Sequence, residues 1–286
     1  MKILIIQENG RHEENREFRE CFNLKRSLIM DGHDCVVWGL GHENFNTPIN
    51  SLINECDAIL VLENYDQINW VPNLKSVNKL KLFWSIDSHL ILQQHQHNVV
   101  KYGIDIVLNA IQSDQNKFNN VKTYYFPNAY PSDLIIPMPN IEKTHFLGFC
   151  GSLLDRGDYI KRLKNDFGLH ADIWKLGNSM VESINSYKIH FNKTLKNDIN
   201  YRVFETMGTK TMLLSNNTEN LTTFFTDMEN IVIYNNDREL YEKLDYLKTN
   251  ESEIYRIAEN GYNNVLNNHT YNHRAKILVE IIKENL

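Results

Sequence analysis

The chain begins with MKILIIQENGRHEENREFRECFNLKRSLIMDGHDCVVW, residues 1–38. Its first apolar run, Lys2–Ile6, is continuous rather than alternating, which is typical of a buried strand. A helical period follows up to Gly32, with one apolar face made of Phe18, Cys21, Phe22, Leu28 and Ile29. Cys35–Trp38 then resumes a strand pattern. This segment is therefore predicted to be a strand–helix–strand unit of a parallel sheet.

Short apolar runs recur along the rest of the first half. Between consecutive runs lie about 15 to 25 residues, which is room for one helix and its loops. These runs are Ala58–Leu62, Lys81–Ile86, Ile104–Leu108 and Thr123–Phe126. The alternation predicts one doubly wound half of the α/β class.

Proline placement predicts the domain boundary, because proline fixes φ and removes a backbone donor. Four of the six prolines fall between Pro127 and Pro139. Beyond them the alternation restarts, with strand patterns at His145–Cys150, Asp172–Leu176, Lys188–Phe191, Thr211–Ser215 and Ile231–Tyr234. We therefore expect two Rossmann-like doubly wound domains, 1–138 and 139–270, facing a central cleft, followed by a C-terminal amphipathic helix over 271–286.

Composition excludes several classes of protein. The 286 residues are 42% hydrophobic, and the net charge of -6 offers no basic footprint for a duplex, which disfavours nucleic acid as the main partner. The four cysteines form no Cys-x-x-Cys pair, which indicates reduced thiols and a cytoplasmic location. There is no run of eighteen apolar residues, so no membrane span is expected.

Familiar chemical motifs are missing as well. Gln7–Arg11 follows the first strand where a Gly-x-Gly-x-x-Gly fingerprint would stand, and there is no P-loop. No His-Glu-x-x-His occurs, and no Asp-x-Asp pair that could hold a metal on a diphosphate. The sequence therefore predicts no metal site and no dinucleotide cofactor.

The informative stretch is YKIHFNKTLKNDINYRVFETMGTKTMLL, residues 187–214. It is predicted to form a strand, a polar loop, a helix and a further strand. Such a loop brings a helix N-terminus to the cleft, where free N–H groups attract phosphate. Arg202 lies in the first turn and could fork onto a phosphate, and Glu205 lies on the same helical face. The alternative is that Arg202 and Glu205 only pair with each other.

Four elements carry a family resemblance. Residues 200–215 resemble the donor-binding segment of GT-B glycosyltransferases, in particular the CgeB-like (spore-maturation) group among the group 1 glycosyl transferases. Lys188–Asn192 is similar to the strand that precedes this segment in the family. Gly151-Ser152 followed by Arg156 resembles the first loop of the family's second domain, and residues 257–274 resemble its closing helices. The resemblance covers roughly 145–280, and the first half matches in architecture alone.

The resemblance implies transfer of a sugar from a nucleotide donor. Glu205 would accept the ribose hydroxyl protons, and Arg156 would neutralise the diphosphate in place of a metal. The other residues implied to bind substrate are Gly151, Ser152, Asn192, Asn200, Tyr201 and Arg202.

One position departs from the family pattern. Many retaining relatives carry Glu-x7-Glu, but eight residues before Glu205 this chain has Asn197. Asp198 is adjacent and could substitute, or Asn197 could contact the sugar through its amide. The sugar and the retention of configuration are left open by this departure.

The first half offers further candidates. Asp87 and His89 follow the predicted strand Lys81–Ile86, at a strand end that a doubly wound sheet exposes to ligand. Either could deprotonate an acceptor hydroxyl, His89 could instead contact the donor sugar, or Asp87 could simply cap a helix. Gly10 and His12, with their neighbours Arg11 and Glu13, follow the first strand in a loop expected to face the acceptor.

These observations lead to one functional hypothesis. We expect a metal-independent, retaining hexosyltransferase of the GT-B type that moves a sugar from a UDP-sugar to a glycan or other cytoplasmic acceptor. The alternatives are a nucleotide-sugar epimerase on the same fold and a non-catalytic nucleotide-sugar-binding module. The short length predicts an open acceptor site built partly from a second copy of the chain, that is, a homo-oligomer.

Overall fold

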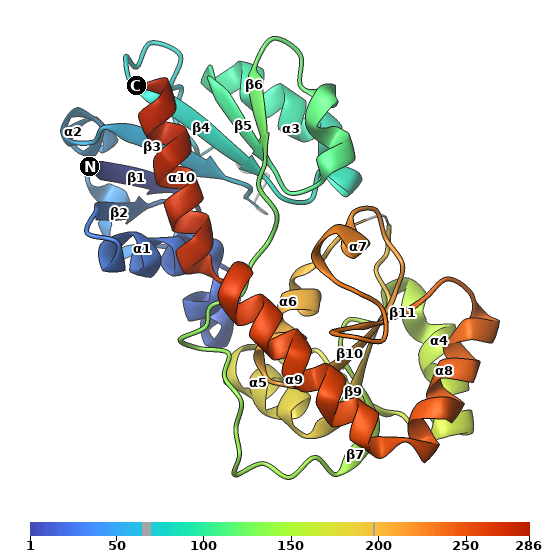
Figure 1. Ribbon diagram of the computed structural model, residues 1–286. Coiled ribbons are helices and arrows are strands. Elements are labelled where there is room, and N and C mark those ends of the chain that lie inside the picture. The colour runs from blue at the N-terminus through green and yellow to red at the C-terminus, as the bar shows by residue number, and fades with distance from the viewer. Residues whose placement is uncertain (65–69, 197) are drawn as a thin grey trace. The chain divides into compact units, whose positions relative to one another are not determined.

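The computed structural model describes residues 1–64, 70–196 and 198–286 (Figure 1). The chain divides into two compact units, one formed by Met1–Asn128 with Tyr271–Leu286 and the other by Ala129–Thr270. The division after Asn128 lies earlier in the proline-rich segment than the predicted boundary at residue 138. The last helix, which the sequence set apart, is part of the first unit.

The first unit holds a six-stranded parallel sheet in the order β2-β1-β3-β4-β5-β6. Its strands are β1 (Lys2–Ile6), β2 (Asp34–Trp38), β3 (Ala58–Leu62), β4 (Leu80–Ser85), β5 (Ile106–Asn109) and β6 (Lys122–Tyr125). They agree with the predicted runs apart from shifts of one or two residues at their ends. All five residues of β3 are buried, as expected for a parallel strand covered on both faces.

Helices cover this sheet. They are α1 (Glu20–Met30), α2 (Ile49–Glu55), α3 (Ser88–Tyr102) and α10 (Tyr271–Asn285), with the short 3-10 turns η1 (Glu13–Phe18), η2 (Glu43–Asn46) and η3 (Gln112–Lys117). The predicted helix over Phe18–Gly32 begins later, at Glu20, because Phe18 belongs to η1. It ends before Gly32, whose φ of +80° is a conformation that glycine adopts readily.

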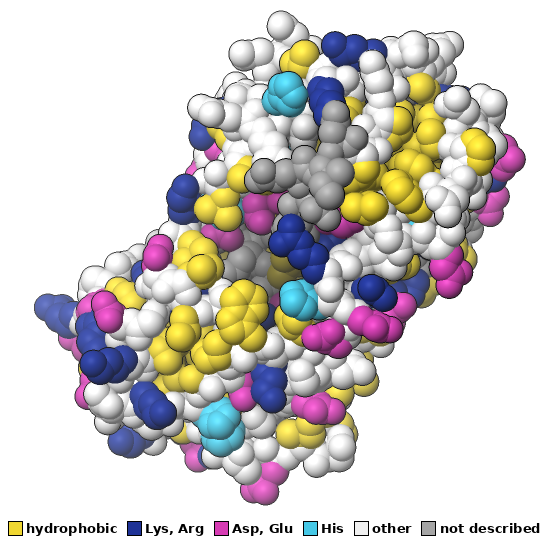
Figure 2. Space-filling model, turned by 180° about the vertical axis from the view of Figure 1, so that it is seen from behind, with side chains coloured by type: hydrophobic (Ala, Val, Ile, Leu, Met, Phe, Trp, Pro, Cys, Tyr) yellow, Lys and Arg dark blue, Asp and Glu magenta, His cyan; other side chains and the backbone are white. Residues whose placement is uncertain are grey.

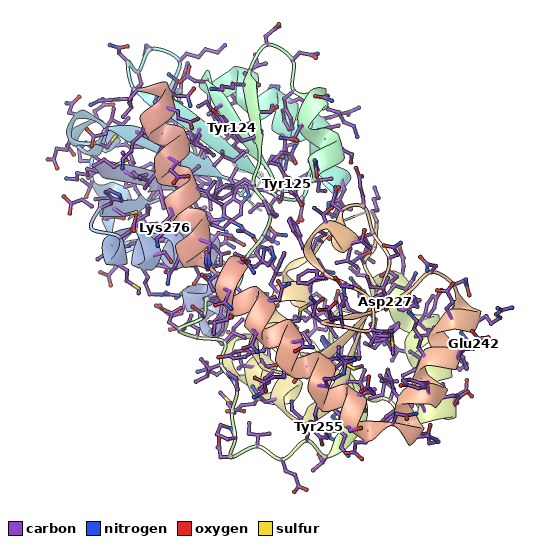
Figure 3. The ribbon with its side chains drawn as sticks, viewed as in Figure 1. Tyr124, Tyr125, Asp227, Glu242, Tyr255 and Lys276 are labelled. Carbon is purple, nitrogen blue, oxygen red and sulfur yellow. The ribbon has the colours of Figure 1, made fainter. Side chains whose placement is uncertain are left out.

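Helix α10 is bound into the first unit along its whole length. It packs beside α1. Near its start the buried Arg274 donates to the carbonyl oxygens of Pro127 (2.8 Å) and Asn128 (3.0 Å), and burial lowers its pKa to about 10. Near its end Asn285 donates to the hydroxyl of Tyr124 (3.2 Å), a β6 residue labelled in Figure 3.

The second unit holds a five-stranded parallel sheet in the order β11-β10-β9-β7-β8. Its strands are β7 (His145–Gly151), β8 (His170–Ile173), β9 (Tyr187–Asn192), β10 (Met212–Asn216) and β11 (Val232–Tyr234). Its helices are α4 (Gly157–Phe167), α5 (Gly177–Asn185), α6 (Tyr201–Gly208), α7 (Leu221–Phe224), α8 (Asp237–Thr249) and α9 (Glu251–Asn268), with the turn η4 (Leu154–Arg156). A buried apolar core joins the strands to α8 and α9.

The predicted strand over Asp172–Leu176 is the least accurate of the set. β8 ends at Ile173, because Trp174 adopts a left-handed conformation with φ of 58°. A strand cannot continue through that conformation. Trp174 instead turns the chain into α5, and its backbone N–H donates to the carbonyl oxygen of Gly151 (3.3 Å).

Both sheets have the same kind of strand order. In the first, β1 lies between β2 and β3, and in the second, β7 lies between β8 and β9. The chain therefore reverses its direction of winding at β1/β3 and again at β7/β9. Ligands of doubly wound sheets bind beyond the carboxyl ends of the strands at such switch points. The fold thus marks one candidate position in each unit.

The surface charges and the cysteines do little to narrow the range of possible functions. All four cysteines are buried and free of disulfides. In the described ranges, no helix is both long and apolar enough to cross a membrane. On the face drawn in Figure 2, cationic and acidic side chains are interspersed rather than gathered into one basic stripe.

Candidate functional site

The switch point of the second sheet is bridged by one arginine. Arg156, in the turn η4, donates through Nε to the carbonyl oxygen of Lys193 (2.5 Å) and through Nη1 to that of Ser152 (3.3 Å). Ser152 follows β7 and Lys193 follows β9. The guanidinium therefore lies between the two loops that the switch point brings together, where the sequence predicted a phosphate-binding group.

Polar side chains fix the loops beyond β9 and β10. Asn192, the last residue of β9, donates to the hydroxyl of Ser215 (3.1 Å). The backbone N–H of Thr194 donates to Asn216 Oδ1 (2.8 Å). These bonds hold the polar ends of both strands beside the arginine-bearing loop, and Asn200 lies within 3.4 Å of Asn192 through its amide.

The helix α6 starts at this edge. Asn200 is its N-cap residue, yet the Asn200 side chain accepts no capping bond from the helix. The positive end of the α6 dipole lies at this edge and favours an anion. This geometry agrees with the prediction that residues 200–202, including Tyr201, supply helix-end N–H groups; the binding role itself stays a prediction.

Arg202 and Glu205 form the ion pair that the sequence left as an alternative. Arg202 Nη1 lies 2.8 Å from Glu205 Oε2, and the two side chains are 21% and 14% exposed. The pair does not exclude ligand binding, because a carboxylate accepts several hydrogen bonds at once. A ribose at Glu205 would share the carboxylate with Arg202.

Two arginines lie close together at this edge. Burial lowers the pKa of Arg156; among its charged neighbours Asp198 has the largest effect and raises the pKa, and Arg202 lowers it. Two guanidinium groups close enough to repel each other are stabilised by an anion between or beside them. A diphosphate has the charge to do so.

A buried histidine connects the two halves of this site. The backbone N–H of Cys150 donates to His190 Nε2 (3.0 Å), so Nδ1 carries the proton and donates it to Thr206 Oγ1 (2.5 Å). His190 is completely buried, and burial together with Arg202 holds its pKa well below the usual value. It ties the residue before Gly151 to the residue after Glu205. Sequence reasoning assigned no role to His190; a histidine between the apolar residues Ile189 and Phe191 of a predicted strand was the available signal.

The candidates of the first unit lie at the carboxyl edge of its own sheet. Asp87 is the N-cap residue of α3 but makes no side-chain capping bond, and His89 lies in the first turn of α3, partly buried. The backbone N–H groups of Ile86 (3.0 Å) and Asp87 (2.7 Å) donate to Glu63. Glu63 thus fixes the loop that carries Asp87.

Glu63 belongs to a buried polar cluster that sequence reasoning missed. Its Oε2 lies 3.2 Å from Nε2 of His95, and His95 Nδ1 lies 2.7 Å from the hydroxyl of Ser85. These residues come from β4, α3 and the loop after β3. No spacing in the sequence indicates that these residues meet, so the cluster can be recognised only from the folded structure.

The loop after β1 holds the remaining candidates. Gly10 has φ of +85°, and a Cβ there would lie 2.7 Å from Cδ of Arg19. His12 is exposed and immediately precedes η1.

The structure therefore assembles one group of predicted residues around β7, β9 and α6 in the second unit, and places Gly10, His12, Asp87 and His89 in the first. Asn197 lies outside the described residues. Within those residues, no three potential metal ligands come together.

Comparison with protein-family models gives one match. A model described as glycosyl transferase-like covers residues 156–280. That range begins at Arg156 and includes α6 with Glu205. The match supports the broader resemblance to glycosyl transferases, while the CgeB-like subgroup stays a prediction. Among curated proteins, none matches the sequence significantly.

Solved structures resemble the whole chain. HepE of Anabaena, solved with UDP and glucose, is 12% identical with a TM-score of 0.67, covering 99% of this chain and 100% of that one. An α-glucosyltransferase solved with UDP and a DNA 13-mer is 12% identical with a TM-score of 0.70, covering 99% of each chain. A sucrose-phosphate synthase of Thermosynechococcus elongatus is 9% identical with a TM-score of 0.66, covering 99% and 98%. At these identities the likeness shows the fold, which is the two-domain GT-B fold.

Proposed function

We propose that this protein is a glycosyltransferase that moves a hexose from a UDP-sugar donor to a glycan or other acceptor, with retention of configuration and without a metal ion. The observation that carries the proposal is the meeting of Arg156, Arg202 and the N-terminus of α6 at the β7/β9 switch point. The presence of UDP in the HepE and α-glucosyltransferase structures supports the choice of nucleotide.

Each part of the site has a task in this reaction. The departing diphosphate gains negative charge as the glycosidic bond to the donor breaks. Arg156 and the α6 N–H groups would stabilise that charge, which is the work a metal ion does in other enzymes. Glu205 would accept hydrogen bonds from the ribose hydroxyls and so orient the nucleotide.

His190 would position this machinery without touching substrate. It fixes the N–H of Cys150 and the hydroxyl of Thr206, which flank Gly151 and Glu205 along the chain. Preorganised groups stabilise developing charge better than groups that must first reorient. We assign His190 a positioning role.

The test is calorimetric titration of UDP into four proteins: wild type, Glu205→Gln, Arg156→Lys and the control Arg238→Gln. Arg238 is 84% exposed on α8 and should leave affinity unchanged. Loss of one charge-assisted contact corresponds to a roughly 10- to 150-fold weaker Kd in the two site variants. Circular dichroism checks that each variant is folded. Equal UDP affinity in Glu205→Gln and wild type would remove the ribose role from Glu205.

Turnover tests the remaining parts of the proposal. Transfer to an acceptor should persist in excess EDTA, and the anomeric configuration of the product, read by NMR, should match that of the donor. Transfer that stops on chelation contradicts the metal-free mechanism. Isomerisation of the donor without any acceptor would identify an epimerase instead.

A further inference from the structure

A kink separates the first turn of α3 from the rest of the helix. Ile91 has φ of -131° and ψ of 35°, which is not a helical conformation. The turn before it carries His89, and Asp87 precedes that turn as the N-cap residue. Both of these residues are partly exposed. Because the kink interrupts the helix, the body of α3 does not by itself fix the position of these two polar groups at the end of β4.

Glu63 holds this turn from the loop after β3. Its Oε2 accepts the backbone N–H groups of Ile86 (3.0 Å) and Asp87 (2.7 Å). The backbone of Glu63 is itself fixed, because its N–H donates to the carbonyl oxygen of Trp84 (3.2 Å) and its carbonyl oxygen accepts from Gln7 Nε2 (3.1 Å). One anchored carboxylate thus connects the loop after β3 to the two residues that lead into α3.

His95 connects the same carboxylate to the body of α3. Its Nε2 lies 3.2 Å from Glu63 Oε2, and its Nδ1 lies 2.7 Å from the hydroxyl of Ser85. The ring of Phe83 meets the imidazole edge-on, with 5.2 Å between the centroids. His95 and His89 lie on opposite sides of the kink, so the contact between His95 and Glu63 bridges the two parts of the helix.

Burial makes this cluster a support for the turn rather than a place for a ligand. The side chains of Glu63 and His95 are 6% and 1% exposed, and Ser85 is fully buried. A buried carboxylate is costly unless hydrogen bonds and a partner compensate its charge, so Glu63 depends on both the two N–H groups and the imidazole. Removing the contact with His95 should therefore loosen the turn that Glu63 holds.

We propose that Glu63 and His95 are positioning residues of the transfer reaction, which hold Asp87 and His89 in place at the end of β4 without touching substrate. This role rests on the proposed function for the reaction itself and on the contacts of the first unit for the positioning. Asp87 and His89 are the groups that the sequence predicted to act on an acceptor hydroxyl or on the donor sugar. Reacting groups work only within a narrow range of positions, and a displacement of about 1 Å can cost roughly a hundred-fold in rate.

Two substitutions of His95 separate its contact with Glu63 from its contact with Ser85. The side-chain amide nitrogen of glutamine reaches about as far as Nε2 of histidine, and that of asparagine about as far as Nδ1. His95→Gln therefore keeps a donor for Glu63, whereas His95→Asn keeps one for Ser85 alone. His97→Gln is the control, because His97 is an exposed residue of the same helix.

Hydrogen exchange of the full-length protein, read by NMR, tests whether the cluster holds the turn. The amides of Ile86 and Asp87 should exchange about ten-fold faster in His95→Asn than in wild type, because the carboxylate that binds them loses its partner. In His95→Gln and His97→Gln their exchange rates should not change. Wild-type exchange rates in His95→Asn would overturn the proposal.

UDP release from UDP-glucose, UDP-galactose and UDP-N-acetylglucosamine, with water as the acceptor, tests the effect on the reaction. His95→Asn should lower kcat about ten-fold or more and leave the KM for the donor within about two-fold, because the nucleotide is proposed to bind in the second unit. His95→Gln should keep most of the wild-type kcat. Circular dichroism melts check that each variant is folded under the assay conditions.

A cluster that only stabilises the fold predicts a different result, in which the two His95 variants lose kcat to the same extent or not at all. Either outcome would overturn the positioning role. A wild-type protein that releases UDP from none of the three donors contradicts the proposed function instead. The hydrogen-exchange result does not depend on turnover, so the two failures can be told apart.

Discussion

His190, which bonds to both β7 and α6, leads to a prediction about how the stability of the protein depends on pH. Because burial keeps the folded-state pKa of His190 well below 6.5, the folded protein holds this ring neutral, whereas the unfolded chain protonates it near its usual value of 6.5. The stabilising contribution is therefore complete above pH 6.5 and is lost as the pH falls below it. A variant without the histidine lacks this dependence.

The magnitude follows from linkage. Between pH 7.5 and pH 5.0, protonation of one unfolded-state histidine of pKa 6.5 stabilises the unfolded chain by about 2 kcal/mol. The substitution His190→Gln also disturbs two buried hydrogen bonds, which costs about 1–3 kcal/mol at pH 7.5. We expect the gap in unfolding free energy between wild type and variant to be about 2 kcal/mol at pH 7.5 and close to zero at pH 5.0.

Urea denaturation followed by circular dichroism measures this gap at both pH values. All other titrating groups are shared by the two proteins, so their contributions cancel in the difference. His97→Gln serves as the control, because His97 is exposed on α3 and its replacement should change stability little at either pH. A gap for His190→Gln that is the same at pH 5.0 and pH 7.5 would refute the view that the fold holds this ring neutral.

Two further substitutions, Gly208→Ala with Gly157→Ala as its control and Arg274→Leu, test the packing of the two units. Gly208→Ala places a Cβ 2.5 Å from the Tyr130 ring and should cost about 1–3 kcal/mol, whereas Gly157→Ala, with nothing within 4 Å of its Cβ, should be neutral or stabilising in the same thermal melts. Arg274→Leu leaves two buried carbonyl oxygens without their donor, so we expect about 3 kcal/mol of lost stability and earlier amide exchange in α10; unchanged exchange would show that α10 is held by its apolar face alone.

Local pattern predicted the strands of both sheets well. β3 and the start of β7 agree with the predicted ends, because a continuous apolar run in a parallel sheet is limited by residues that must reach water. The predicted bounds of β8 were less accurate, because tryptophan favours strands, whereas the backbone of Trp174 is left-handed here. A sequence pattern shows which secondary structure a side chain favours; the turn at Trp174 is imposed by the loop that the chain enters there.

The candidate site, like the strands, could be predicted from the sequence only in part. Arg156, Arg202 and Glu205 could be proposed because they lie in or near one contiguous run that resembles a family segment. The contacts of Arg156 with the loops after β7 and β9 could not be proposed, because those loops are far apart in the chain. The same holds for the Glu63 cluster, where a loop residue contacts a histidine of α3.

By itself, then, the sequence determined the α/β class, most strands and the proline-marked change between halves, because periodicity and composition are local properties; the diphosphate site is a prediction from the family resemblance. The tertiary structure alone decided the strand order, the switch points, the return of α10 to the first unit, and the contacts of Arg156 with the loops after β7 and β9. Those features depend on contacts between distant segments, and such contacts form only where the buried faces of the elements pack together.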